Sequence, residues 1–114
     1  EKPFEYKYFI GKKAEGDEIV GSAYDVVQYA SYHDLRIGLK YCSKEKPCGK
    51  VNYIEIYVRQ SSEEGIAYLD DSTNLGERYI KITLLCVKIT YVMFNALLYG
   101  TYNDTYEENS ILNS

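Results

Sequence analysis

Three cysteines and a single histidine are the residues of this chain with the most distinctive chemistry. Cys42 and Cys48 enclose the polar segment SKEKP, and this spacing suits a local disulfide in an oxidising compartment. A pair of reduced loop cysteines is the alternative. Because a structural zinc site takes about four Cys or His ligands and His33 is the only histidine, we predict no metal site.

Cys86 lies inside the apolar run YIKITLLCVKITYVMFNALLYG, residues 79–100. A nucleophilic cysteine needs a histidine base and an electropositive setting, and the run offers only Lys88. If Cys42 pairs with Cys48, Cys86 is either a free thiol or a disulfide to a second chain, which would form a homodimer. Pairing of Cys86 with either loop cysteine stays open.

Catalysis by acid and base groups is not predicted. It requires a histidine or a carboxylate pair positioned in a cleft, whereas His33 and the neighbouring Asp34 lie in a polar segment typical of a solvated surface. We therefore expect a protein that is not an enzyme and that binds no cofactor.

A glycosylation sequon and the start of the chain favour secretion, and the net charge argues against nucleic acid as a partner. NDT at 103–105 is an acceptor sequon for a glycan on Asn103, and a start at Glu1 fits a mature or a trimmed chain. The net charge of −4 gives no attraction to phosphate backbones. With the expected loop disulfide, these features predict an extracellular protein.

Alternating apolar and polar residues predict β-strands at several places. In VNYIEIYVRQ, Ile54, Ile56 and Val58 form an aliphatic side, while Tyr53 and Tyr57 lie on the opposite, wetter side. Similar patterns occur in FEYKYFIG, LRIGLKYC and IAYL, and turn-forming segments separate them. We predict a mainly β fold, a single small antiparallel β-sandwich or open barrel.

One segment is ambiguous, and the chain end lacks a pattern. SAYDVVQYASYHD fits a strand slightly better than a helix, so one short helix near 23–32 remains an alternative. We expect one β-rich domain over residues 1–105 and a flexible C-terminal tail over 106–114.

The apolar run is long enough to cross a bilayer as a helix, but charges disfavour that reading. Lys81 and Lys88 would each cost a few kcal/mol inside a membrane. A buried helix also fits the spacing, yet β-branched residues abound, and they favour strands. Because strands seldom exceed about ten residues, we predict two strands that reverse between Cys86 and Ile89, through a loop or bulge without turn-forming residues.

Tyrosine is over-represented, with fourteen copies and no tryptophan. Tyrosine suits half-buried strand faces, and it is also enriched at the energetic centres of protein interfaces. The side of the predicted strand that carries Tyr53 and Tyr57 is therefore our candidate interaction face.

In chain order, GKKAEGDEIV, NYIEIYVRQSSEEGIAYL, YIKITLL and NALLYG form a series of motifs, and the similarity that they carry covers about residues 8 to 100. The series resembles the insect multiprotein bridging factor 2 family, which typically has Gly, a basic residue, Gly-Asp and an aliphatic pair, then isoleucine-rich strands and a final Tyr-Gly. Only Gly76 remains of the family's glycine-rich loop, and CVKI replaces its polar turn. The matching residues are Gly11, Lys13, Gly16, Asp17, Ile19, Val20, Ile54, Ile56, Gly65, Ala67, Tyr99 and Gly100.

The resemblance implies a secreted, β-rich, non-enzymatic insect protein. We expect it to bind another protein, such as a host extracellular protein or receptor, and in a blood-feeding insect to be a salivary factor that modulates host immunity or haemostasis. One alternative is the role behind the family name, a nuclear transcription coactivator. A second alternative is a carrier of a small apolar ligand inside a β-barrel.

Overall fold

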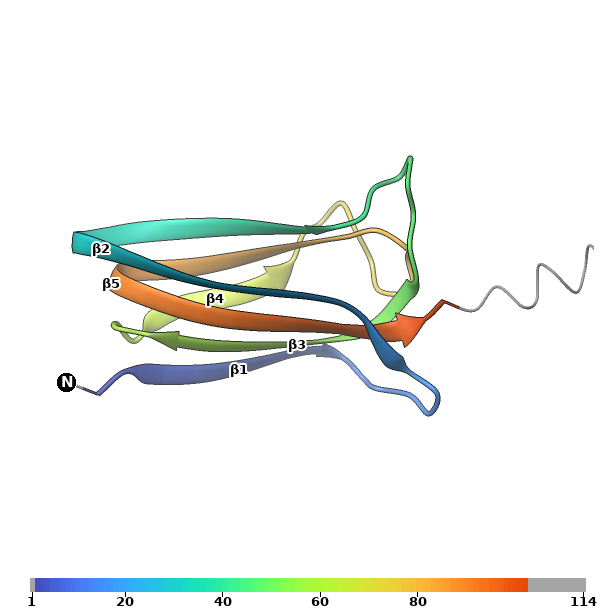
Figure 1. The fold of residues 1–114 in the computed structure, drawn as a ribbon, viewed down its shortest axis with the longest axis horizontal. Helices are drawn as coiled ribbons and strands as arrows, with labels where there is room; N and C mark the ends of the chain where they lie inside the picture. Colours follow the sequence, from blue (N-terminus) through green and yellow to red (C-terminus); the bar gives the residue numbers. More distant parts are fainter. Residues whose placement is uncertain (1, 103–114) are drawn as a thin grey trace, which may run out of the picture.

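The computed structural model describes residues 2–102 and consists of one antiparallel sheet of five strands that does not close into a barrel. The pairing order is β1-β3-β5-β2, and β4 pairs with β5 beside this path (Figure 1). The mainly β fold predicted from the sequence is confirmed. The strands are β1 (Phe4–Gly11), β2 (Glu18–Tyr41), β3 (Lys50–Gln60), β4 (Glu64–Leu69) and β5 (Ile80–Thr101).

The two longest strands both bend at the same end of the molecule, as Figure 1 shows, so that each contributes two arms. The arms of β2 are residues 18–29 and 33–41, and those of β5 are residues 80–87 and 89–101. The first layer contains β1, β3, the second arm of β5 and the first arm of β2. The second layer contains β4, the first arm of β5 and the second arm of β2.

The segment 23–32 is part of strand β2, so the helical alternative is wrong. Val26, Val27 and three nearby tyrosines are β-branched or aromatic residues that fit a pleated surface better than a helix. The register with β5 shifts between Gln28 and His33, where the strand bends.

The predicted division of the apolar run into two strands is wrong, because β5 is continuous from Ile80 to Thr101. Its direction nevertheless changes near Lys88, which adopts a left-handed φ of 57°. Such a conformation costs a non-glycine residue roughly 1 kcal/mol or more. The carboxylate of Asp34 accepts a 2.9 Å hydrogen bond from the Lys88 N–H, and this contact stabilises the bend.

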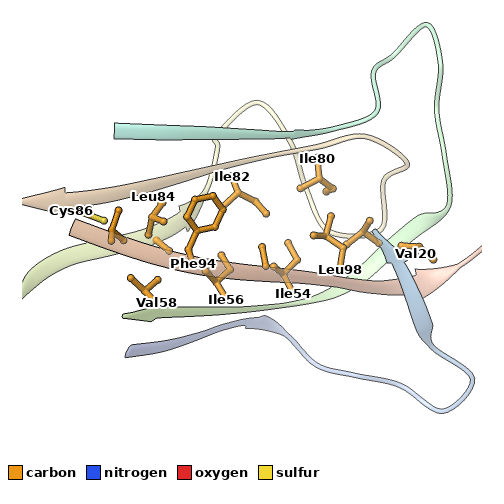
Figure 2. Packing of buried hydrophobic residues seen from close by; sticks show 14 of the residues in the cluster. Val20, Ile54, Ile56, Val58, Ile80, Ile82, Leu84, Cys86, Phe94 and Leu98 are labelled. Atoms are coloured by element: carbon orange, nitrogen blue, oxygen red, sulfur yellow. The ribbon is translucent and has the colours of Figure 1, made fainter. Parts of the chain in front are cut away.

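The core lies between the two layers. Ile54, Ile56 and Val58 of β3 are at most 1% exposed, which confirms the aliphatic side predicted from the alternation. Figure 2 shows Phe94 of the first layer beside Ile82 of the second. Hydrophobic burial across this space is what holds the two layers together.

Predicted features beyond residue 102 fall outside the described residues. Among them are the glycan acceptor Asn103 and the tail 106–114.

Candidate functional site

Aromatic and apolar side chains gather on the outer side of the first layer. The strand register places Tyr57 opposite Asn95, Glu55 opposite Leu97 and Tyr53 opposite Tyr99. Phe9 is opposite Glu55, and Tyr24 is opposite Asn95. Since paired residues share a side of the sheet, these side chains form one surface. We call it the aromatic face, defined by Phe9, Tyr24, Tyr53, Tyr57, Leu97 and Tyr99.

The aromatic face is open to solvent at two of its largest side chains. Phe9 is 60% exposed and Tyr24 is 67% exposed, whereas Tyr53 and Tyr57 are half-buried. A contiguous exposed apolar area on a small protein marks an interaction site more often than scattered apolar residues do.

A shallow groove of about 270 Å³ crosses the aromatic face between β1, β3 and β5. Its walls carry apolar rings and one charge of each sign, a mixture that suits an incoming apolar side chain with a polar flank. The lining residues are Lys7, Phe9, Glu55, Ile56, Tyr57, Asn95 and Leu97.

Hydrogen bonds fix the two tyrosines that the sequence predicted for this face. The Tyr57 hydroxyl donates to Oε1 of Glu5 at 2.8 Å, and Nη2 of Arg59 donates to the other oxygen of that carboxylate at 3.2 Å. The Tyr53 hydroxyl donates to Oε2 of Glu55 at 2.9 Å. Partial burial, and then this hydrogen bond, raise the pKa of Tyr53 above its usual value, so its hydroxyl remains a neutral donor.

Ring contacts add to this preorganisation. The ring centroids of Tyr53 and Tyr99 are 5.5 Å apart, and Nζ of Lys13 lies 4.9 Å from the centroid of Tyr99. Side chains that are held before binding lose less rotamer entropy when a partner arrives. Sequence reasoning found Tyr53 and Tyr57 but missed Phe9, Tyr24 and Leu97, because which strands are neighbours cannot be seen in local alternation.

Cys42 and Cys48 form the predicted disulfide, with their Cα atoms 6.0 Å apart. The loop that they close connects β2 to β3. Arg78 holds the loop from the segment before β5, since its Nη1 donates to the carbonyl of Cys48 at 3.0 Å and its own carbonyl accepts from the Cys48 N–H at 3.0 Å. The disulfide therefore fixes one end of the sandwich.

Removing this disulfide should destabilise the fold moderately. We expect the double variant Cys42→Ser, Cys48→Ser to lose about 2 kcal/mol of unfolding free energy, because a short closed loop restricts the unfolded chain only modestly. Urea unfolding followed by circular dichroism measures the loss. An unchanged midpoint would show that the hydrogen bonds from Arg78 and Tyr41 hold the loop without the disulfide.

Cys86 is a free thiol and only 1% exposed, within the core between the layers. The prediction that it lies at the edge of a reversal is wrong, because β5 continues through it and pairs with β2 and β4 on its two sides. A covalent dimer through this thiol would require the core to open. Burial also raises its pKa to about 11.

The Cys86 thiol should resist reagents in the folded protein. Because thiolate is the reactive form and its pKa is raised, we expect alkylation at pH 8 to be negligible until denaturant is added. The folded pKa exceeds the unfolded value, so the stability that Cys86 contributes is complete below about pH 9 and is lost as the pH rises toward 11. Comparing wild type with Cys86→Ala across this interval isolates the effect from tyrosine ionisation.

His33 lies at the bend of β2, where it is exposed and stacks on Tyr29 with ring centroids 4.1 Å apart. Its Nδ1 is 2.9 Å from the carbonyl oxygen of Ser31. No group of three His, Cys, Asp or Glu side chains within residues 2–102 is arranged to hold a metal ion. The same residues include no helix of the length and hydropathy that a membrane crossing requires.

Comparisons with family models, curated proteins and solved structures give no match for this chain.

Proposed function

We propose that this chain is a secreted, non-enzymatic protein that binds another protein through the aromatic face. The observation that carries the proposal is the groove between Phe9, Tyr57 and Leu97, next to rings that hydrogen bonds hold in place. Exposed aromatic side chains around a groove supply most of the binding energy in many protein interfaces. The partner presents an apolar side chain that fits this groove.

The disulfide between Cys42 and Cys48 supports the extracellular part of the proposal. Disulfides persist in oxidising compartments and are rare in the reducing cytosol and nucleus. The role of a nuclear coactivator is therefore the less supported alternative. Free thiols at Cys42 and Cys48 in the native protein would favour it.

The one pocket described between the layers is small for the carrier alternative. The pocket between the layers at the β2 side has a volume of about 50 Å³, whereas pockets for small-molecule ligands usually occupy about 300 to 1,000 Å³. The larger groove lies on the outer surface, where it favours a protein side chain.

The resemblance to the insect bridging factor family supplies the biological setting of the proposal. We propose an insect source and a host extracellular protein or receptor as the partner, with salivary modulation of host immunity or haemostasis as the role. Host plasma and insect secretions are accordingly the two pools in which to seek the partner.

The test compares capture of plasma and secreted proteins by wild type and by the double variant Phe9→Ser, Tyr57→Ser. We expect wild type to retain a specific protein. The double variant should bind it at least about thirtyfold more weakly, since a central hot-spot residue contributes about 2 kcal/mol or more. Calorimetry on the purified pair measures the difference.

Ile66→Ser is the matched control, because Ile66 is 49% exposed on the outer side of the second layer. It should bind as wild type does. Equal binding by the double variant, or the absence of any specific ligand, would contradict the proposal.

A further inference from the structure

Strand β2 is an edge strand along both of its arms. It pairs with β5 on one side, and within residues 2–102 no strand pairs with its other side. Natural sheets usually shorten such edges or interrupt them with proline or lysine. β2 has 24 residues, contains no proline, and carries no lysine or arginine in its first arm. A bulge between Ile19 and Gly21 interrupts only the start of this arm, so residues 21–29 are open to pairing with another strand.

The two arms of β2 lie one above the other at this free side. The rings of Tyr29 and His33 stack, and a Cβ on Gly21 would lie 2.7 Å from the Tyr41 ring. In both pairs the residues are equally distant along the chain from Ser31. The two arms therefore run in opposite directions in the two layers, and residues equally distant from Ser31 lie at the same position along the strand axis.

Between Gly21 and Tyr29, after the register shift at Ile19/Gly21, the even-numbered residues of the first arm direct their backbone groups away from β5. The Val26 N–H donates to Oδ1 of Asp25 at 2.8 Å and not to β5. The carbonyl of Tyr91, the partner of Gln28 in the register, accepts from the Ser61 N–H at 3.1 Å on the side of β3, so Gln28 likewise directs its backbone groups away from β5. Since bonding direction alternates along an antiparallel strand, Ser22 and Tyr24 also direct their backbone groups away from β5.

In the second arm, too, the even-numbered residues direct their backbone N–H and C=O groups to the free edge. The Lys81 N–H donates to Oγ1 of Thr73 at 3.3 Å, and the Lys81 carbonyl accepts from the Asp70 N–H at 2.9 Å, both away from β2. Lys40, the partner of Lys81 in the register, therefore directs its backbone groups to the free edge. Gly38 and Arg36 follow by alternation.

We propose that a second copy of this chain pairs with the β2 edge, so that the first arm of each copy joins the second arm of the other. A half turn about an axis parallel to the strands brings these arms together antiparallel in both layers. Tyr24 then lies opposite Gly38 of the other copy, and Ser22 lies opposite Lys40. Because each arm is used once, the assembly closes as a dimer.

Charge and shape fit this arrangement. The first arm carries a net negative charge from Glu18 and Asp25, and the second arm a net positive charge from Arg36, Lys40 and Asp34. Asp25, the partner of core residue Phe94, and Lys40, the partner of Lys81, face opposite sides of the sheet, so the attraction acts between whole arms and not between paired side chains. The space where a Gly38 side chain would lie is empty, since no atom comes within 4 Å of a Cβ there. An aromatic ring commonly covers a glycine across paired strands, and Tyr24, 67% exposed, supplies that ring.

This inference uses Tyr24 of the aromatic face but none of the residues that line its groove, and it is tested without any binding partner. Sedimentation of the full chain should give twice its 13.2 kDa mass. Val26→Pro removes an edge N–H that the ladder with β5 does not use, so the variant should fold. In the symmetric dimer the Val26 N–H of each copy would donate one hydrogen bond to the other copy. The loss of both bonds should weaken association by roughly thirtyfold or more.

Val26→Thr keeps the N–H and the β-branched shape, and it should dimerise as wild type does. Gly38→Pro tests the second arm should Val26→Pro prove unstable. Hydrogen exchange on wild type gives a readout without any variant: amides of Ser22, Tyr24 and Gly38 should be protected in the dimer and exposed on dilution. A monomer at high concentration, a dimer that survives both proline variants, or assemblies larger than two would overturn the proposal.

Discussion

Replacing Phe94 with alanine should lower the free energy of unfolding by about 4 kcal/mol. Phe94 is 3% exposed and lies between the layers, beside Ile82 (Figure 2). Its removal loses buried apolar surface and leaves a cavity that rigid strands cannot fill. Because domains of this size are stable by only about 5 to 15 kcal/mol, this change consumes a large share of the stability. Urea unfolding measures it.

Phe9→Ala is the matched control, since it removes the same side chain from a site that is 60% exposed. Its unfolding free energy should stay within about 0.5 kcal/mol of wild type. Equal losses in the two variants would mean that the layers do not pack through Phe94.

Gly100→Ala should destabilise the fold by about 3 kcal/mol or more. A Cβ at Gly100 would overlap the carbonyl oxygen of Lys50 and would lie 3.0 Å from the Cα of Val51. These atoms are backbone, so no side-chain rotation relieves the clash, and β3 and β5 would have to separate at their paired ends. Thermal unfolding should show a strongly reduced midpoint.

Gly38→Ala provides the control for the effect of removing a strand glycine. Within a single copy of the chain its Cβ meets open space, and the φ of Gly38 is not in the left-handed region. The unfolding is measured at a dilution at which the proposed dimer, where Tyr24 of the other copy covers Gly38, has dissociated. Alanine restricts the unfolded chain, so we expect a gain of about 0.5 kcal/mol. A stable Gly100→Ala variant would contradict the close approach of the two strands.

Local alternation was sufficient to predict β3. Ile54, Ile56 and Val58 are buried and Tyr53 and Tyr57 face outward because a strand places successive side chains on opposite sides. The disulfide was equally local, since six positions separate Cys42 from Cys48. Features of this kind depend on neighbours in the sequence, and the sequence displays them directly.

The course of β5 could not be predicted in the same way. The sequence indicated a reversal near Lys88, but a change of direction does not require the strand to end. Pairing with β2 continues on both sides of the bend, through His33 opposite Ile89 and Leu35 opposite Cys86. That pairing is a long-range property, and it buries a thiol that the sequence placed at a surface turn.

The candidate site was found only in part for the same reason. Tyr53 and Tyr57 were recognisable within one strand, whereas Phe9 and Leu97 join them only because β1 and β5 flank β3. Strand order depends on which edges meet after collapse, and a single sequence contains no direct signal of it.

The shared long strands have a consequence for how the protein acquires its structure. Each layer contains one arm of β2 and one arm of β5, so neither layer has a complete set of strands that could form without the other. Folding should therefore be a single all-or-none event. It should also be slow, because the two strands that must meet are separated by the whole of β3 and β4. During synthesis, no stable intermediate is expected before residues 80–101 emerge.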